Sequence, residues 1–213
     1  MWSVDFEYDG ARIRSSAASQ IQEEFSPHAF WLTQVHGNRV IAVDTLSSRE
    51  LCSADGQFTT QSELSLGIKT ADCMPVFLIA KGRAVAAIHA GWKGVLSKIV
   101  HEGFRLFKDH GIECCDVSMV IGPHIDAYSF DVQQDLLSLF GTRIDTGADI
   151  LRKSNGCIAL DLYGVLMRDL QEDGWCPKKV IRFGGDTFTN QQLCSYRRDN
   201  SEAGRIHSTV ELL

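Results

Sequence analysis

Short apolar runs alternate irregularly with amphipathic stretches along this chain. Continuous apolar, β-prone runs predict strands at 30–35, 40–43, 64–68, 75–80, 84–88, 117–121 and 180–183. Apolar residues at helical spacing predict a helix that starts at Lys93 and ends before Gly111, and two more helices over 131–140 and 161–172. The stretch from Asn190 is polar, and we expect it to be irregular until a final short strand. This pattern predicts a layered, mixed α/β fold.

The runs 75–80 and 84–88 predict a hairpin, because Lys81-Gly82-Arg83 between them is a turn-forming segment. Cys73 lies just before the first strand of this hairpin, and His89 lies at the end of the second. In an antiparallel pair centred on Gly82, both side chains emerge at the same open end, with Cβ atoms roughly 4.5–8 Å apart. That separation suits two ligands of one metal ion, and it equally suits a catalytic Cys–His pair.

His36 is a third candidate, because it opens a predicted turn, His36-Gly37-Asn38-Arg39, between two apolar runs. Turns and strand ends are the places where a rigid scaffold presents functional groups. Two imidazoles and one thiolate are a zinc-type ligand set, and three protein ligands leave a fourth position for water or substrate. The residues alone leave open whether His36 joins the other two.

Composition restricts the class of protein. The 213 residues are 44% hydrophobic and 23% charged, which is typical of an ordinary globular protein, and we expect one domain over residues 1–213. The formal charge of −6, without a basic stripe, argues against a nucleic-acid partner. No apolar run reaches the ~18 residues of a membrane span, and the first residues do not resemble a secretory signal. We therefore expect a cytoplasmic protein with reduced thiols.

Six of the seven cysteines carry no sign of chemistry in the sequence. A free cysteine is most often a small buried hydrophobic residue. We expect this of Cys52, Cys114, Cys115, Cys157, Cys176 and Cys194.

Five short motifs occur in order between about Trp31 and Arg205: Gln34-Val35-His36-Gly37, Thr70-Ala71-Asp72-Cys73-Met74-Pro75, His89-Ala90-Gly91-Trp92-Lys93-Gly94, Ile121-Gly122-Pro123 and Ser195-Tyr196-Arg197-Arg198-Asp199. Together they resemble the laccase-domain purine nucleoside phosphorylase family, whose members are also called YfiH-like. The resemblance implies a mixed α/β sandwich and a zinc site that carries over onto His36, Cys73 and His89. It also implies phosphorolysis of adenosine, inosine, guanosine and methylthioadenosine, and hydrolytic deamination of adenosine.

The same motifs supply candidates around the metal. Asp72, beside Cys73, is a candidate for proton transfer or for support of the ligands, and equally for a turn-capping carboxylate. Asp55 matches an acidic position of the family and is a candidate for a ribose hydroxyl contact. Trp92 is a candidate for stacking on the purine base, although a core tryptophan is about as common.

Phosphate requires cationic groups. The predicted helix start Gly91-Trp92-Lys93-Gly94 offers backbone N–H groups, Lys93 adds a charge, and Arg197 with Arg198 could clamp phosphate oxygens. Two positions depart from the family pattern. Lys93 stands where the family usually has Arg, which loses the planar fork, and His124 follows the Gly-Pro pair where small residues or Cys are usual. We interpret His124 as a substrate-pocket group rather than an additional metal neighbour.

Three alternatives remain open from the sequence. An older interpretation of the family is a copper-dependent polyphenol oxidase, although multicopper sites need more ligands than seven scattered histidines supply. Cys73 could instead be the nucleophile of a metal-free hydrolase, activated by His89 and oriented by His36 or Asp72. The chain could also be a binding protein without catalysis.

Overall fold

A fully buried hairpin lies at the centre of the largest sheet of the computed structural model, which describes residues 2–18, 29–44 and 53–213. Strand β7 (Met74–Ala80) pairs with β8 (Ala84–Ala90) in antiparallel register, from Ala80 opposite Ala84 to Met74 opposite Ala90. Every residue of both strands is buried, as expected of continuous apolar runs that are covered on both faces. The predicted hairpin is confirmed.

Three sheets organise the described chain. The six-stranded sheet has the order β13-β9-β7-β8-β5-β4, formed with β4 (Val40–Ala42), β5 (Gly56–Thr59), β9 (Ser118–Ile121) and β13 (Lys179–Arg182). The five-stranded sheet has the order β1-β2-β14-β6-β3, formed by β1 (Ser3–Tyr8), β2 (Ala11–Ala18), β3 (Ala29–Trp31), β6 (Ser65–Thr70) and β14 (Arg205–Leu212). A small sheet, β10-β12-β11, comprises β10 (Asp131–Val132), β11 (Ile150–Arg152) and β12 (Ile158–Leu160).

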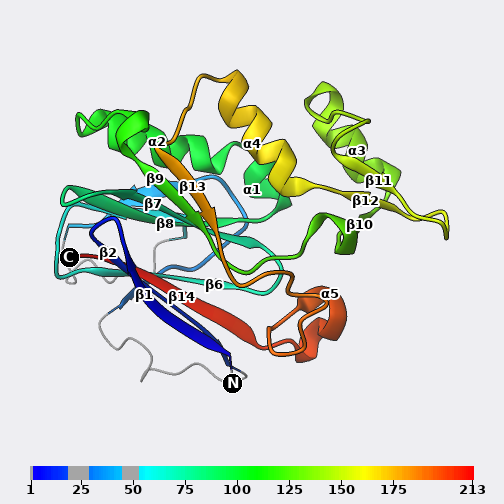
Figure 1. Ribbon diagram of the computed structural model, residues 1–213, viewed down its shortest axis with the longest axis horizontal. Coiled ribbons are helices and arrows are strands. Elements are labelled where there is room, and N and C mark those ends of the chain that lie inside the picture. The colour runs from blue at the N-terminus through cyan, green and yellow to red at the C-terminus, as the bar shows by residue number, and fades with distance from the viewer. Residues whose placement is uncertain (1, 19–28, 45–52) are drawn as a thin grey trace.

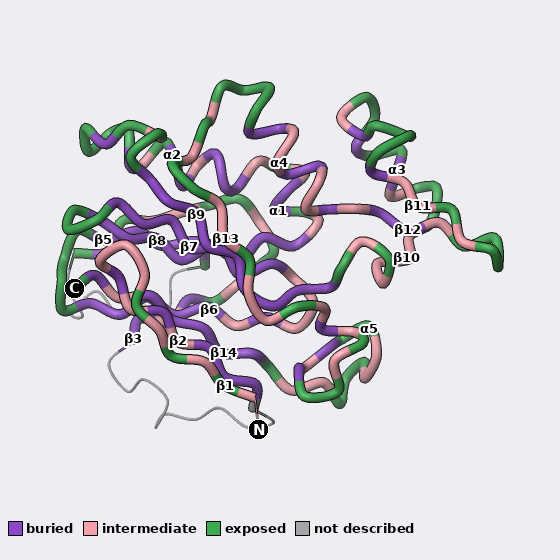
Figure 2. The backbone as a smooth tube through the Cα atoms, in the orientation of Figure 1, coloured by how far each residue is buried: buried purple, intermediate pink, exposed green. Residues whose placement is uncertain are grey.

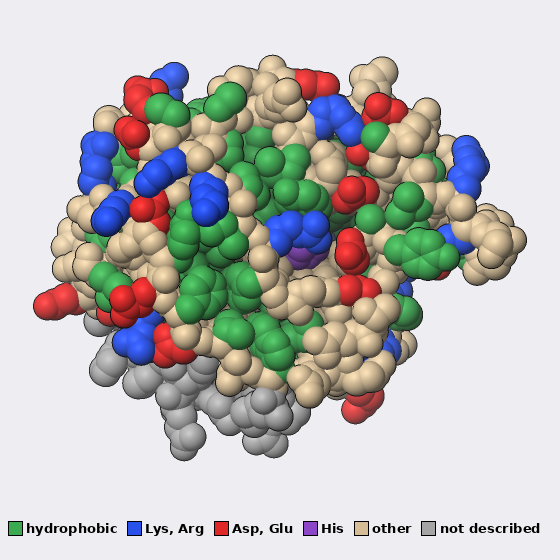
Figure 3. Space-filling view, in the orientation of Figure 1, with side chains coloured by type: hydrophobic (Ala, Val, Ile, Leu, Met, Phe, Trp, Pro, Cys, Tyr) green, Lys and Arg blue, Asp and Glu red, His purple; other side chains and the backbone are tan. Residues whose placement is uncertain are grey.

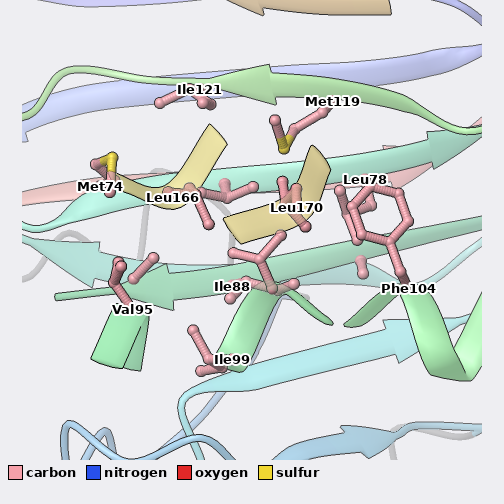
Figure 4. Packing of buried hydrophobic residues seen from close by; sticks show 14 of the residues in the cluster. Met74, Leu78, Ile88, Val95, Ile99, Phe104, Met119, Ile121, Leu166 and Leu170 are labelled. Carbon is pink, nitrogen blue, oxygen red and sulfur yellow. The ribbon is translucent and has the colours of Figure 1, made fainter. Parts of the chain in front are cut away.

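The two large sheets and a layer of helices stack on one another (Figure 1). Alternate residues of the hairpin face opposite ways: Phe77 and Ile79 pack in the core shared with the five-stranded sheet. Val76 and Leu78 pack against the helical layer of α1 (Trp92–Leu96), α2 (Ile99–Asp109) and α4 (Leu162–Glu172). Figure 4 shows Leu166 and Leu170 of α4 and Phe104 of α2 lying over the strands, and Figure 2 shows that burial concentrates in these layers. The predicted mixed α/β sandwich is confirmed.

A lobe projects from one end of these layers and contains the small sheet and α3 (Gln134–Phe140) (Figure 1). Two arginine–aspartate pairs join it to α4: Arg143 binds Asp169, and Arg168 binds Asp149. Arg143 also donates hydrogen bonds to the last carbonyls of α1, at Val95 (3.1 Å) and Leu96 (2.7 Å). The lobe is therefore anchored to the helical layer through two guanidinium groups, and that of Arg143 contacts both α1 and α4.

The structure corrects several predicted elements. The helix from Lys93 is two helices, because Lys98 adopts a left-handed φ of 61° between α1 and α2. The helix expected over 131–140 begins only at Gln134, since Asp131 and Val132 pair with β12 as a strand. The final strand is long and central rather than short, and it lies between β2 and β6. The hairpin β1–β2 was not predicted.

Short helices complete the described chain: α5 (Tyr196–Asp199) and the 3₁₀ helices η2 (Cys114–Asp116), η3 (Ala127–Ser129), η4 (Gly141–Arg143) and η5 (Asn200–Glu202). The expectation of buried cysteines is wrong for Cys115, Cys157 and Cys176, which are exposed. Cys114 and Cys194 are half-buried, and Cys52 lies outside the described residues. No helix within the described ranges has the length and apolarity needed to span a bilayer.

Candidate metal centre

The open end of the buried hairpin carries Cys73 and His89, as the alternation of the strands requires. His89 lies opposite Pro75 in the register of β7 and β8, and the same register continued by one pair beyond Met74 and Ala90 places Cys73 opposite Gly91. Cys73 is therefore the diagonal neighbour of His89 across the pair. A Cβ atom at Gly91 would lie 2.9 Å from the Cys73 Sγ, so glycine leaves the space that the thiol occupies. The predicted proximity of the thiol and the imidazole is present in the structure.

His36 comes to the same place from the loop between β3 and β4. The potential ligand atoms of His36, Cys73 and His89 all lie within 4.8 Å of one another. The two imidazole rings meet edge to face, with centroids 4.8 Å apart and planes 78° apart. His36 is exposed and His89 is buried, so the group opens to solvent on the His36 side. It is the one such group of three found in residues 2–18, 29–44 and 53–213.

Asp55 is the carboxylate that connects the two histidines. It immediately precedes β5, whose register with β8 places it opposite His89, and it is fully buried. Its Oδ1 lies 2.8 Å from the Nδ1 of His89 and accepts the His36 backbone N–H at 2.8 Å. Its Oδ2 accepts the N–H groups of Gly37 (2.7 Å) and Val35 (3.2 Å).

This environment differs from the ribose contact that the sequence suggested for Asp55. A carboxylate that is enclosed by a loop and accepts four donors does not face a substrate. A carboxylate on the second ring nitrogen of a histidine is instead the usual support of a metal-ligating imidazole. The sequence carried no signal of this role, because it depends on the pairing of β5 with β8.

The acid–base properties of the group follow from these contacts. Burial alone would raise the pKa of the Cys73 thiol, but hydrogen bonds from His36 and His89 outweigh it and lower that pKa to about 7. Burial alone would lower the pKa of His89, but Asp55 and Cys73 outweigh it and raise that pKa to about 9. Hydrogen bonds from His89 and the loop also outweigh burial at Asp55, whose pKa is held below its ordinary value. The thiolate, which is the metal-binding form of cysteine, is therefore favoured near neutral pH.

The donor set fits a metal ion. It comprises one thiolate-forming cysteine and two imidazoles, a combination that suits zinc and also copper. The Nδ1 of His89 is engaged with Asp55, which leaves its Nε2 for an ion. The backbone carries strain at the same place, because both His36 (φ 60°) and Asp72 (φ 86°) adopt left-handed conformations.

Asp72 ties the turn of Cys73 to two other segments. Its Oδ1 accepts the hydroxyl of Thr187 at 2.6 Å, and its Oδ2 accepts the backbone N–H of Arg197 at 2.6 Å. Its carbonyl oxygen accepts the N–H of Ile125 at 2.9 Å. The side chain thus joins the hairpin end to the loop that precedes β14.

Arg197 and Arg198 point to different partners, and the structure does not assemble them as a two-point clamp. Arg197 is exposed, donates to the Asp131 carbonyl at 2.7 Å and lies 5.4 Å from the Phe130 ring. The guanidinium of Arg198 pairs with Asp199 and donates to four carbonyl oxygens of its own loop, those of Thr187, Phe188, Asn190 and Leu193. Arg198 therefore shapes the loop that contacts Asp72.

The remaining candidates lie outside the ligand group. Lys93 is exposed, with its ammonium 5.5 Å from the ring of Trp92, and Trp92 is half-buried against the helical core. His124 is buried, and its Nδ1 lies 2.7 Å from the Gly122 carbonyl. Burial lowers the pKa of His124, and a weak contact of 3.4 Å joins its Nε2 to Arg182.

The sequence matches a family model described as multi-copper polyphenol oxidoreductase laccase over residues 5–213. A purine nucleoside phosphorylase of Clostridium acetobutylicum is 30% identical over 183 residues, which cover 84% of this chain and 75% of the relative. Purine nucleoside phosphorylase YfiH of Escherichia coli is 31% identical over 190 residues, with 86% and 73% covered.

Solved structures agree on the fold. A Neisseria meningitidis protein of the DUF152 family superposes with a TM-score of 0.81 at 21% identity, covering 99% of this chain and 98% of that one. The Bacillus licheniformis protein YfiH gives a TM-score of 0.77 at 24% identity, covering 87% of this chain and 74% of that one. The chain accordingly belongs to the laccase-domain family that includes YfiH, whose similar members are named purine nucleoside phosphorylases.

Proposed function

We propose that this chain is a zinc-dependent enzyme of purine nucleosides. Its proposed reactions are phosphorolysis of adenosine, inosine, guanosine and methylthioadenosine, and hydrolytic deamination of adenosine. The observation that supports this proposal is the convergence of His36, Cys73 and His89 within 4.8 Å, in a family whose similar members are named purine nucleoside phosphorylases. Three protein ligands with an exposed side are the arrangement of a catalytic rather than a structural zinc site.

The protein's part in binding zinc is to present donors in the correct protonation state. Cys73 supplies a thiolate, His89 is oriented by Asp55, and His36 supplies the ligand on the solvent side. When bound, zinc provides Lewis acidity and makes water a stronger nucleophile at neutral pH. The hydrogen bonds from Thr187 and Arg197 to Asp72 favour a supporting role for this carboxylate over proton transfer.

The proposed reactions need further groups that bind the phosphate ion and the purine base. In phosphorolysis a phosphate oxygen forms a bond to the ribose C1′ while the bond to the purine nitrogen breaks, and the purine leaves with a proton. Lys93 and Arg197 are the exposed cations proposed to bind phosphate. The ring of Trp92 is the proposed stacking surface, and the buried His124 is a proposed uncharged group of the substrate pocket.

The distribution of charge on one face of the molecule does not suit nucleic acid. On the face shown in Figure 3, acidic and basic side chains are interspersed and apolar areas lie between them. This face therefore offers no continuous basic stripe of the kind that follows a phosphate backbone.

A copper polyphenol oxidase is the alternative that the family description raises. Oxidation of phenols by oxygen in multicopper enzymes uses several copper ions and correspondingly many histidines. Within the described ranges a single group of three potential ligands is present, and only two of its members are histidines. The donor count therefore favours single-ion chemistry.

The test uses purified protein loaded with zinc and incubated with adenosine and phosphate, with adenine and inosine measured together. We expect both products, and we expect Cys73→Ala to lose zinc and at least about a hundredfold of both rates, since a direct ligand is removed. Cys115→Ala is the matched control, because Cys115 is an exposed thiol outside the group and its loss should change neither zinc content nor rate.

Other outcomes would identify the alternatives. Full activity and full zinc in Cys73→Ala would contradict the proposed site. Nucleoside turnover without any metal that still requires Cys73 would favour the cysteine hydrolase. Stoichiometric copper with oxidation of phenols would favour the oxidase. No turnover at full zinc occupancy would contradict an enzymatic role on these substrates.

A further inference from the structure

One buried carboxylate contacts both histidines of the candidate metal centre by different means. Asp55 holds the His89 imidazole through a side-chain hydrogen bond of 2.8 Å. It holds His36 through the backbone, since it accepts the N–H groups of Val35, His36 and Gly37 in succession. Three consecutive N–H groups around one anion form a concave anion site, and that geometry accounts for the left-handed φ of 60° at His36.

We propose that Asp55 is the positioning residue of the metal centre: it fixes both histidine ligands together and thereby sets the affinity for zinc. The inference rests on the proposed zinc site, but it does not depend on which substrate or reaction the site serves. Asp55 is fully buried beneath the loop, so its effect reaches the ion only through His89 and the 35–37 backbone.

The contacts require a carboxylate and exclude its amide. Oδ1 serves His89 and the N–H of His36, while Oδ2 serves the N–H groups of Gly37 and Val35. Asparagine has one oxygen, which accepts hydrogen bonds, and one NH₂ group, which only donates them. In either orientation of the amide, the NH₂ group therefore faces N–H groups that need an acceptor. One orientation disturbs the tautomer of His89, and the other releases the loop that carries His36. Asp55→Asn therefore changes the site while preserving the size of the side chain.

The experiment measures zinc affinity by competition with a chromophoric chelator, without substrate. We expect Asp55→Asn to weaken zinc binding by about 10–100-fold, the usual effect of losing the group that supports a metal-ligating histidine. Asp149→Asn is the matched control. Asp149 is a buried carboxylate that accepts the Asp145 N–H at 2.8 Å and pairs with Arg168 in the lobe, and its substitution should leave zinc affinity unchanged.

A second measurement tests the geometry of the site. Cobalt replaces zinc in the unsubstituted protein and in both variants, and the absorption spectrum of bound Co²⁺ reports its coordination geometry. We expect the spectrum of Asp55→Asn to differ from that of the unsubstituted protein and Asp149→Asn to match it. Unchanged zinc affinity and cobalt spectrum in folded Asp55→Asn would overturn the proposal. Equal losses in Asp55→Asn and Asp149→Asn would also overturn it, since the effect would then belong to any buried carboxylate.

A measurement on the unsubstituted protein applies even where Asp55→Asn does not fold. In the zinc-loaded chain, ¹⁵N NMR of the imidazoles should show His89 protonated at Nδ1 and metal-bound through Nε2. Zinc on the Nδ1 of His89 would contradict the proposal, because Asp55 occupies that nitrogen. These readouts are independent of catalysis. A chain that binds zinc in the expected Asp55-dependent way but never converts adenosine would contradict the proposed function and leave this inference intact.

Discussion

The two sides of the candidate metal centre are built in opposite ways. Cys73 directly precedes β7 and His89 belongs to β8, two fully buried strands that are joined by a three-residue turn, so the backbone that places them is fixed by local pairing and by the core. His36 lies on an exposed loop in a left-handed conformation, and Asp55, distant in sequence, holds that loop through three backbone hydrogen bonds. One side is rigid because of its strands, and the other because of one carboxylate.

Because of this difference, a substitution can lower the stability of the fold, the affinity for metal, or both, depending on the side that it changes. A change on the hairpin side disturbs the buried core and its hydrogen bonds as well as the site. A change at the exposed His36 disturbs the site alone. Stability and metal affinity should therefore respond differently on the two sides, and substitutions at His89, His36, Gly91 and Gly37 test that expectation.

The largest effect is expected from His89→Ala. Removal of the imidazole leaves Asp55 buried without its side-chain partner, and breaking such a pair costs about 3 kcal/mol of unfolding free energy. His36→Asn is the partner variant: asparagine tolerates a left-handed φ, and an exposed change should stay within about 0.5 kcal/mol. Urea unfolding of the metal-free proteins measures both values.

Zinc affinity should fall in both variants, because each removes a proposed direct ligand. We expect losses above the ~100-fold that a supporting residue produces. A stability loss in His36→Asn as large as that in His89→Ala would contradict the distinction between the two sides. Retention of zinc affinity by His36→Asn would remove His36 from the site.

The two neighbouring arginines give the second test. Arg198→Ala removes a guanidinium that donates to four carbonyls of its loop, and we expect a loss of about 2 kcal/mol in unfolding free energy. Arg197→Ala removes an exposed side chain and should stay within about 0.5 kcal/mol, while raising the KM for phosphate. Unfolding and phosphate titration measure the pair. An unchanged KM in Arg197→Ala would exclude Arg197 as a phosphate contact.

Two glycines beside the ligands give a smaller and finer test. A Cβ atom at Gly91 would lie 2.9 Å from the Cys73 Sγ, whereas one at Gly37 would meet only ordinary contacts, the nearest at 3.6 Å. Gly91→Ala must displace the thiol, and we expect about tenfold weaker zinc binding, equivalent to about 1.4 kcal/mol of overpacking. Gly37→Ala is the control and should bind zinc normally. Equal affinities in both variants would mean that the thiol moves aside without cost.

The hairpin could be predicted from sequence because all its determinants are local. Its apolar runs, its turn and the positions of Cys73 and His89 lie within seventeen residues, so the register follows from the turn. The same reasoning failed for the last strand, since its neighbours β2 and β6 are distant in sequence and its length depends on their pairing. Lys98 gave no signal for the break between α1 and α2, because lysine rarely adopts the left-handed φ of 61° that it has there.

The site shows the same limit. Three ligand candidates could be named from the motifs, but the roles of nearby carboxylates could not. Asp72 stands next to a ligand in sequence and accepts hydrogen bonds from Thr187 and Arg197. Asp55 lies 34 residues from His89 and contacts it directly. Sequence adjacency pointed to Asp72 for support, whereas strand pairing, which sequence did not specify, placed Asp55 against the imidazole.

The smallest expected effect is on the pH dependence of stability, in which His89 differs from the buried histidines elsewhere in the chain. Burial lowers the pKa of His101, His124 and His207 below 6.5, so below that pH the unfolded chain binds more protons than the folded one. Stability of the metal-free protein should therefore fall as the pH drops from about 7 to 5, by at most about 1.4 kcal/mol per pH unit for each histidine. His89 behaves oppositely: its raised pKa stabilises the fold at low pH, and that contribution is lost as the pH rises through about 9.

His207→Gln isolates this acid effect, because His207 is buried on β14 against the edge of Trp31 and far in sequence from the ligands. Glutamine does not titrate, so the variant should lose less stability than the unsubstituted chain over the same pH interval, by about 1 kcal/mol. Urea unfolding at pH 7 and pH 5 measures the difference. An unchanged pH dependence would mean that His207 becomes protonated in the folded state, and that burial at this position does not oppose charge as it does in a packed core.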